Sequence, residues 1–470
     1  MADYYLEDGS FRDRQGRVFY LNTKVYRGLS PQAYEEWQCL SETRFFKDCG
    51  GDGKIVKTGL AELDNLSESD KNAIGYWQAY LEHEKIPYIT YPYEWCFSML
   101  KDAALLQLEL LQRALEEDMI LKDSTPYNIQ WVGTNPVFID ISSFEKLKPG
   151  EPWIGYRQFC QLYLFPLILQ AYKNVSFHPL LIGDIDGIQP DQCNNLMSFR
   201  DLFKKGVFLH VYLQAKAQSK YSNSNKNMKT LLKDAGFNKT LIKANLQRLD
   251  KTINALEWKT SSGTWVDYSE THSYQDDEDR QKKQFVRSAV ETRSSWDIVW
   301  DLGANVGIYS RIASERAEVV LSMDIDHATV ERLYLSLKKE DNKKIIPLVM
   351  NVASPSPGLG WRGVERKTLI DRGKPGLVLC LALIHHVVIS SNIPLKDFIN
   401  WLESLNAEIV IEFITKQDEM VQKLLQNKED IYEDYEMPYF EKCLYDSFQV
   451  EKKEEVKPGK RYMYFVKKKN

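Results

Sequence analysis

Short apolar runs recur through the second half of the chain, separated by longer amphipathic stretches. Five of these runs consist mainly of aliphatic residues: 297–300, 318–323, 345–350, 377–383 and 408–413. Continuous apolar runs predict strands that are buried on both faces of a sheet, and residues 326–342 place apolar side chains at helical spacing between two of them. Residues 447–469 have the pattern of a closing antiparallel hairpin. Strands that alternate with helices predict an α/β domain with a parallel sheet.

The first half of the chain mixes strand signals with one long helix. Residues 18–28 predict two strands around a turn, and residues 93–119 carry apolar side chains at helical spacing. Residues 131–144 predict a hairpin that turns at residues 133–135. These patterns indicate an α+β domain.

Two changes in composition divide the chain into three parts. Residues 215–230 are polar and poor in apolar side chains, and residues 268–283 are strongly charged. Such stretches are typical of solvated connections, and the helical pattern between them predicts a small connector. We therefore expect an α+β domain over 1–205, a helical connector over 206–257 and an α/β domain over 258–470.

The overall composition is that of an ordinary globular protein, and it gives little support for a nucleic-acid or membrane partner. The chain has 470 residues, of which 43% are hydrophobic and 27% charged, and its net charge is -5. This acidic balance gives no sign of a nucleic-acid partner. Seven scattered cysteines without a Cys-x-x-Cys pair argue against a disulfide scaffold and predict a cytoplasmic protein. The longest apolar run, residues 159–172, is shorter than a membrane span and predicts a buried helix.

A glycine turn stands between two apolar runs that both end on carboxylates. Asp301 ends the first run, Gly303 and Gly307 follow it, and Asp324 lies 21 residues after Gly303 (324 − 303). A strand that leads through a glycine turn into a helix creates a nucleotide site at the carboxyl edge of a parallel sheet. A carboxylate about 20 residues further on can accept hydrogen bonds from ribose hydroxyls. An acid at the start of the turn would repel a pyrophosphate and suits a cationic ligand.

This Asp-x-Gly-Ala-Asn-x-Gly turn resembles the first motif of class I methyltransferases that use S-adenosyl-L-methionine (SAM) and have a Rossmann-like fold. The resemblance covers roughly residues 258–470 and implies that SAM is the cofactor, with Asp324 on its ribose. It also implies that Asn351 lies near the adenine and that residues 264–274 cover the site. The residues that it places around the methionine part of SAM are Asp301, Gly303, Ala304, Asn305 and Gly307.

Three residues at the ends of the last two runs are candidates for the chemistry. His385 and His386 follow the fourth run, where members of the family place catalytic or substrate-facing groups, and Glu412 lies at the end of the fifth. Methyl transfer needs a positioned nucleophile, and histidine is the natural base near neutral pH. One histidine could instead be structural, and Glu412 could bind substrate or cap the next helix. An acidic acceptor would need no base.

A second constellation lies in the first half. Asp123 and Asn128 have the spacing Asp-x-x-x-x-Asn, and Asp140 ends an apolar run twelve residues later (140 − 128). This order resembles the catalytic loop and metal-binding aspartate of protein-kinase-like folds, and it implies a site for magnesium and ATP. The chain departs from that pattern, because Leu121 stands at the usual histidine position and Lys24 is only a candidate for the strand lysine. The three polar residues could instead cap local turns.

The chain as a whole resembles a group of bacterial two-part proteins described as SAM-dependent methyltransferases, some of them called nodulation-protein-like. Residues 155–172, 355–369 and 382–386 carry this resemblance. We therefore expect methyl transfer to a small molecule or glycan, or to a protein, with the kinase-like half recruiting or covering the substrate. Two alternatives stay open: a bifunctional protein that also transfers phosphate from magnesium–ATP, and a non-catalytic SAM-binding module.

Overall fold

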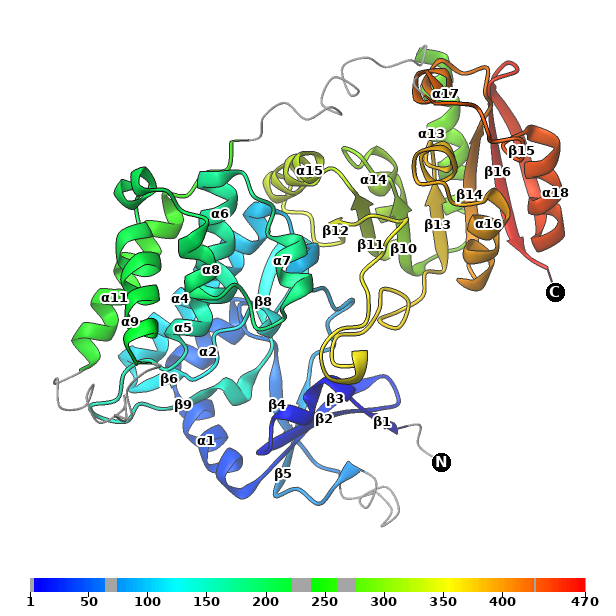
Figure 1. Cartoon of the computed structure of the whole chain (residues 1–470). Coiled ribbons are helices and arrows are strands. Elements are labelled where there is room, and N and C mark those ends of the chain that lie inside the picture. The colour runs from blue at the N-terminus through cyan, green and yellow to red at the C-terminus, as the bar shows by residue number, and fades with distance from the viewer. Residues whose placement is uncertain (1–3, 64–73, 222–237, 260–275, 427, 470) are drawn as a thin grey trace.

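The computed structural model describes five segments of the chain, residues 4–63, 74–221, 238–259, 276–426 and 428–469. The N-terminal half combines a small sheet with a group of helices, and the C-terminal half is built around one larger sheet (Figure 1). Residues 264–274, which were expected to cover the cofactor site, lie outside the described segments.

A seven-stranded sheet forms the centre of the C-terminal half, with the strand order β12-β11-β10-β13-β14-β16-β15. Its strands are β10 (Trp296–Leu302), β11 (Ala317–Asp324), β12 (Ile345–Val349), β13 (Leu377–Cys380), β14 (Glu408–Ile414), β15 (Phe448–Lys457) and β16 (Arg461–Lys468). The first five pair in parallel, and β16 runs antiparallel to β14 and β15. The predicted strands, the closing hairpin and the α/β class of this half are thus confirmed.

Helices cover this sheet on two faces. Neighbouring residues of one strand belong to separate cores: Val299 and Val320 pack into one, and Trp300 and Leu321 into the other. Strands buried on both faces need apolar residues at every position, which explains the unbroken apolar runs. The helices of this half are α13 (Asp276–Val290), α14 (Ile308–Ser314), α15 (His327–Lys339), η8 (Trp361–Gly363), η9 (His386–Ser390), α16 (Leu395–Ser404), α17 (Glu419–Leu425) and α18 (Met437–Ser447).

The N-terminal half begins with a five-stranded antiparallel sheet in the order β1-β2-β3-β5-β4. Helix α1 starts behind Ser30, whose hydroxyl accepts a hydrogen bond from the backbone N–H of Ala33 and so caps the helix. The elements of this region are β1 (Tyr4–Leu6), η1 (Asp8–Arg12), β2 (Gly16–Leu21), β3 (Lys24–Leu29), α1 (Pro31–Glu42), α2 (Arg44–Gly51), β4 (Thr58–Ala61) and β5 (Ala79–His83).

The remainder of the N-terminal half is organised around the long helix α4 (Phe97–Glu116), which is buried along most of its length. Two short antiparallel strand pairs follow it: β6 (Met119–Leu121) pairs with β9 (Phe144–Lys146), and β7 (Ile129–Val132) with β8 (Asn135–Phe138). The second is the predicted hairpin. The other helices are η2 (Pro92–Glu94), η3 (Pro126–Asn128), η4 (Ile141–Ser143), α5 (Tyr156–Phe159), η5 (Cys160–Leu164), α6 (Phe165–Lys173), α7 (His178–Gly183), α8 (Pro190–Asn195), η6 (Phe199–Phe203), η7 (Val207–Tyr212), α9 (Leu213–Tyr221) and α11 (Lys239–Asn254).

The apolar segment 159–172 is a buried helix, as predicted, because its residues pack in the core of the N-terminal half. Within the described segments, every helix is too short or too polar for a membrane crossing. Helix α11 of the expected connector packs on α4, where the ammonium of Lys101 donates to the carbonyl oxygens of Asn254 and Leu256 at 3.0 and 2.8 Å. This part of the connector is therefore joined to the N-terminal half.

The two halves meet along α15 and the loop that follows it. The hydroxyl of Tyr334 donates to Asp102 at 2.6 Å, and Glu331 accepts from the backbone N–H of Ser98 at 2.9 Å. The β7–β8 turn contacts the loop before β12, because the N–H of Thr134 donates to the carbonyl oxygen of Asn342 at 3.1 Å. The predicted β7–β8 hairpin thus forms part of the contact between the two halves.

We expect Gly133→Ala to weaken this junction. Gly133 has a φ of +58°, and a Cβ there would lie 2.2 Å from the carbonyl oxygen of Asn342. Gly53 has a similar φ of +70° with open space around its Cβ position, so Gly53→Ala isolates the backbone cost. Urea unfolding should give a loss for Gly133→Ala that exceeds the control by about 1–3 kcal/mol, the usual cost of overpacking. Equal losses would contradict tight docking of the halves.

Candidate functional site

The glycine turn after β10 has the backbone conformation that its sequence requires. Gly303, Asn305 and Gly307 have positive φ angles of +74°, +49° and +76°. The turn is pinned to β11, because the N–H groups of Gly303 and Ala304 both donate to the carbonyl oxygen of Met323 at 2.9 Å. A Cβ at Gly307 would lie 2.7 Å from a methyl carbon of Leu333, so this glycine permits close packing of α15.

A cavity of about 370 Å³ opens at the carboxyl ends of β10, β11, β12 and β13. This is the edge at which open parallel sheets bind ligands, and the volume lies within the range of roughly 300–1,000 Å³ that is typical of small-molecule sites. Asp301, Gly307, His385 and Glu412 lie outside the lining. The predicted site residues that line it are Gly303, Ala304, Asn305, Asp324, Asn351 and His386.

Asp324 faces this cavity from the end of β11 and is held by the backbone. Its Oδ2 accepts from the N–H of Asn305 and its Oδ1 from the N–H of Asp326, both at 2.9 Å. Burial raises the pKa of the Asp324 carboxyl, and the hydrogen bond from Asp326 opposes that rise. Each carboxylate oxygen has more than one acceptor position, so a ligand with two adjacent hydroxyls can still bind to the fixed carboxylate.

Asp301 lies behind the cavity wall and is only 1% exposed. Its Oδ2 accepts from the hydroxyl of Ser310 at 2.5 Å, and the hydroxyl of Ser322 donates to Ser310 at 2.6 Å. Burial raises the pKa of Asp301 to about 6, although the hydrogen bond from Ser310 opposes the rise. The acid that opens the motif therefore supports the turn from behind.

We expect Asp301→Asn to stabilise the protein at high pH. A carboxyl whose folded pKa is raised contributes stability below its unfolded pKa of 3.8, and this contribution is lost as the pH rises through about 6. The variant should therefore gain about 3 kcal/mol at pH 8 and about 1 kcal/mol at pH 4.5. Urea unfolding at both pH values checks this. The control is Asp297→Asn, because Asp297 lies on the same strand and is exposed. An equal effect at both pH values would contradict a buried ionised Asp301.

The β12 end of the cavity is formed by Met350 and Asn351. Met350 is 4% exposed, and its N–H donates to the carbonyl oxygen of Asp324 at 2.8 Å. The side-chain oxygen of Asn351 accepts from the N–H of Ala353 at 3.0 Å and so shapes the loop that leaves the strand. Met350, Asn351 and Asp324 thus form one continuous wall.

The two histidines after β13 have different environments. His386 lines the cavity, and burial lowers the pKa of its imidazole to about 4, so the ring is neutral near pH 7. His385 is fully buried, which lowers its pKa well below the usual value, and its ring nitrogens have no hydrogen-bond partner among the described residues. The two rings lie 4.1 Å apart between centroids. Only His386 can reach a molecule in the cavity directly.

Two buried ion pairs border the β13–β14 end of the cavity. The ammonium of Lys282, on α13, lies 2.6 Å from Glu412, and Glu412 also accepts from the N–H of Ala382 at 2.8 Å. Arg461 donates twice to Asp418, at 2.7 and 3.0 Å. Lys282 and Arg461 line the cavity, whereas their acidic partners hold them in place.

Neither Lys282 nor Arg461 was predicted from the sequence. One local signal could have identified Lys282, because it lies three and four residues before Phe285 and Val286, which are buried on α13. A lysine at this spacing shares the apolar face of a helix and needs a partner there. Arg461 gives no such signal, because its carboxylate lies 43 residues away.

The polar cluster of the N-terminal half also comes together. The amide of Asn128 donates to Asp140 at 3.4 Å, and Arg27 on β3 lies 2.8 Å from the other oxygen of Asp140. Burial would raise the pKa of Asp140, but the charge of Arg27 and two serine hydroxyls outweigh it and lower the pKa. Burial and the charge of Asp140 raise the pKa of Asp123. Lys24 points elsewhere and pairs with Glu82 on β5 at 2.7 Å, so Arg27 is the basic residue on Asp140.

Asp140 is thus already held by protein groups. The hydroxyl of Ser142 donates to it at 2.8 Å, and the hydroxyl of Ser143 makes a shorter bond. Among the described residues, no group of three or more His, Cys, Asp or Glu side chains is arranged to hold a metal ion. This cluster is an ion pair supported by hydrogen bonds.

Taken together, the sheet and the cavity define an α/β half with a small-molecule-sized cavity at the carboxyl ends of its parallel strands. No protein-family model matches the chain. The chain is 31% identical over 464 residues to the nodulation protein NoeA of Rhizobium meliloti (strain 1021), and the match covers 97% of this chain and 94% of that protein. The chain therefore belongs to the NoeA family.

The solved structures that resemble part of the chain include three methyltransferases, with TM-scores near 0.3. The N-methyltransferase NodS from Bradyrhizobium japonicum WM9 is 6% identical, with 41% of this chain and 98% of NodS covered and a TM-score of 0.31. Magnesium protoporphyrin IX methyltransferase (ChlM) from Synechocystis PCC 6803, with bound SAH (S-adenosylhomocysteine), is 17% identical, with 41% and 85% covered and a TM-score of 0.29. The bifunctional kinase-methyltransferase WbdD is 15% identical, with 41% and 40% covered and a TM-score of 0.29.

Proposed function

We propose that this protein is an enzyme that transfers a methyl group from SAM to an acceptor bound beside it in the C-terminal cavity. The observation that carries the proposal is Asp324, a carboxylate fixed by two backbone N–H groups on the wall of a cavity that a glycine turn borders. A carboxylate in that position suits the two hydroxyls of a ribose. When bound, SAM supplies a methyl group on a positively charged sulfur.

The strand order of the sheet distinguishes the two ends of the cavity. Asn351 follows β12 and Asp324 ends β11 at one end, whereas His386 and the Lys282–Glu412 pair lie by β13 and β14 at the other. We assign the adenosine part of SAM to the first end and the acceptor to the second. Gly303, Ala304 and Asn305 lie between them and leave room for the methionine part, because the turn brings backbone close to the ligand.

His386 is the residue we assign to proton transfer. Its imidazole faces the cavity and is neutral near pH 7, since burial lowers its pKa to about 4. A neutral imidazole can accept the proton that an acceptor hydroxyl or ammonium must lose. His385 and Glu412 support this end of the cavity from behind: the ring of His385 packs against that of His386 at a tilt of 40°, and Glu412 fixes Lys282 and the N–H of Ala382.

We propose a small molecule or a glycan as the methyl acceptor. A cavity of about 370 Å³ bordered by two buried ion pairs suits a compact polar group. The relative NoeA is named a nodulation protein, and we extend to this chain a part in the same kind of process. A protein acceptor is a weaker choice, because one of its side chains would have to enter this small cavity beside SAM.

Radiolabelled SAM tests the transfer directly. The full-length protein is incubated with [methyl-3H]SAM and a fractionated metabolite and glycan extract, and label is counted in each fraction. We expect label in a fraction of low molecular mass, and none with His386→Gln although that variant still binds SAH. A protein that binds SAH but labels no fraction would be a non-catalytic binding module.

A second candidate function rests on the cluster of Asp123, Asn128 and Asp140. The kinase-like fold of the N-terminal half stays a prediction, and so does phosphate transfer from magnesium–ATP. The ion pair between Asp140 and Arg27 would have to open before Asp140 could bind magnesium. Titration of the full-length protein with magnesium–ATP tests this, with Asp140→Asn as the matched variant. Binding that Asp140→Asn abolishes would support a bifunctional protein, and no binding would leave this half a recruiting domain.

A further inference from the structure

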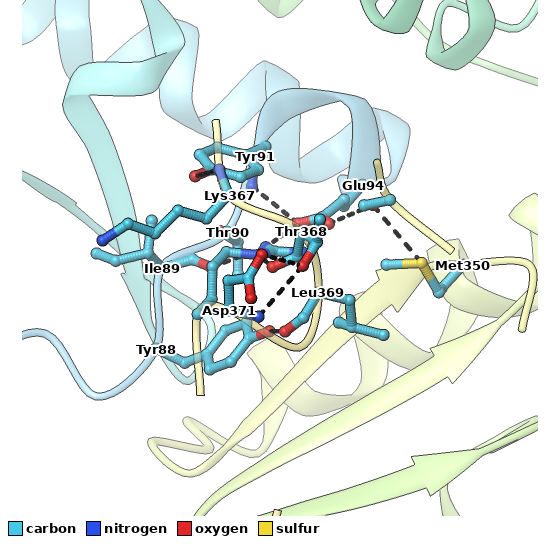
Figure 2. A network of polar contacts seen from close by, with 12 residues as sticks. Tyr88, Ile89, Thr90, Tyr91, Glu94, Met350, Lys367, Thr368, Leu369 and Asp371 are labelled. Atoms are coloured by element: carbon cyan, nitrogen blue, oxygen red, sulfur yellow. Dashed lines mark hydrogen bonds and ion pairs between the residues drawn. The ribbon is translucent and has the colours of Figure 1, made fainter. Parts of the chain in front are cut away.

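The segment between β12 and β13 leaves the cavity, crosses to the N-terminal half and returns. It starts at Met350, which lines the cavity, and contacts the chain around Tyr88–Glu94 (Figure 2). The N–H of Lys367 donates to the hydroxyl of Tyr91 at 2.8 Å, and the hydroxyl of Tyr88 donates to the carbonyl oxygen of Leu369 at 2.9 Å. A wall of the cavity is thus anchored outside its own sheet.

Glu94 of the N-terminal half is the centre of this contact and is fully buried. Its two oxygens accept from the guanidinium of Arg372 at 2.5 and 2.8 Å, and Arg372 also donates to the carbonyl oxygen of Ile89 at 2.8 Å. The N–H of Tyr91 donates to Glu94 at 2.9 Å. A buried carboxylate with these partners has one orientation, because any rotation would leave charged groups unpaired.

One further hydrogen bond links Glu94 to the cavity wall. The hydroxyl of Ser356 donates to Glu94 at 2.5 Å and lies 3.6 Å from the sulfur of Met350. Ser356 and Met350 are 7% and 4% exposed, so neither side chain has much room to move. Figure 2 shows Glu94 and Met350 on facing segments, joined by this chain of contacts.

We propose that Glu94 is a positioning residue for the cofactor and that it acts on the cavity wall through Ser356 and Met350. The N-terminal half then contributes to the SAM site, because it fixes the position of the cavity wall to which we assign the adenine. This inference rests on the proposed function, since it assumes that SAM occupies the cavity. It assigns to the N-terminal half a role that needs no catalysis of its own.

Ser356→Ala tests the link without breaking the buried ion pair, because Arg372 still satisfies Glu94. We expect SAH to bind roughly 2- to 30-fold more weakly, the range typical of substitutions along a contiguous side-chain network. Ser356→Thr keeps the hydroxyl and should bind SAH as the wild type does. The control is Thr368→Ala on the same segment, where the hydroxyl bonds to no described residue other than the exposed Asp371.

Isothermal titration with SAH and urea unfolding are measured together on these full-length variants. The inference is supported if Ser356→Ala loses affinity while Ser356→Thr and Thr368→Ala do not, and if the affinity loss exceeds any change in unfolding. Unchanged affinity in Ser356→Ala, or an equal loss in Thr368→Ala, overturns it. Failure of the wild type to bind SAH would instead refute the proposed function, so the two failures are distinguishable.

Discussion

Replacing Asp324 by alanine is expected to weaken SAH binding by about 30- to 1000-fold. A hydroxyl hydrogen bond to a charged group contributes about 1.5–3 kcal/mol, and a ribose can make two such bonds to one carboxylate. Because water replaces part of these bonds in the variant, about 2–4 kcal/mol should be lost. The protein fold should survive, because the backbone N–H groups of Asn305 and Asp326 would be exposed to water in the enlarged cavity. Equilibrium dialysis against radiolabelled SAH measures the change.

The matched control is Asp326→Asn, two residues further along the chain. Asp326 caps α15 by accepting from the N–H of Thr329, and an asparagine keeps that role while removing the same charge. Its side chain does not line the cavity. We expect Asp326→Asn to bind SAH within about threefold of the wild type, a difference of less than 1 kcal/mol. Parallel losses in both variants would mean that overall charge, and not contact with the ligand, controls affinity.

Lys282→Met should destabilise the folded protein by about 3–5 kcal/mol, the cost of leaving a buried charge without its partner. The side chains of Lys282 and Glu412 are 3% and 0% exposed, so water cannot replace the lost ammonium. Urea unfolding followed by circular dichroism measures the loss. Removing the stranded charge as well, in Lys282→Met/Glu412→Gln, should restore most of the stability while the hydrogen bond from Ala382 is kept.

Lys283→Met provides the surface comparison for this substitution. Lys283 neighbours Lys282 on α13, but its side chain is 42% exposed and pairs with Asp279 one helical turn away. Exposed pairs of this kind contribute about 0–1 kcal/mol. Similar losses for the two lysines would contradict the assignment of Lys282–Glu412 as a buried pair.

Most of the C-terminal fold follows from local sequence patterns. Each strand of the parallel part is a run of apolar residues, since both faces are covered, and the glycine turn needs positive φ at fixed positions. The site was harder to predict in detail. Spacing placed Asp301 and Asp324 near the same turn, but only the geometry of the strand end decides that Asp324 faces the cavity while Asp301 bonds to Ser310 behind it.

The remaining features depend on contacts between distant parts of the chain. Arg372 and Glu94 are 278 residues apart, and Lys282 and Glu412 are 130 apart, so no periodicity connects them. The predicted polar cluster of the N-terminal half did come together, but its basic partner is Arg27, which a search for a strand lysine would miss. Sequence patterns identify strands and turns, whereas long-range charge pairing is decided by the fold.

Calorimetric titration of the full-length wild-type protein with SAH tests the central claim most directly. We expect saturable binding of one SAH per chain, with a heat that changes between two temperatures because apolar surface is buried. We also expect excess SAM to compete for the same site. No binding heat at either temperature would contradict the assignment of the C-terminal cavity to SAM.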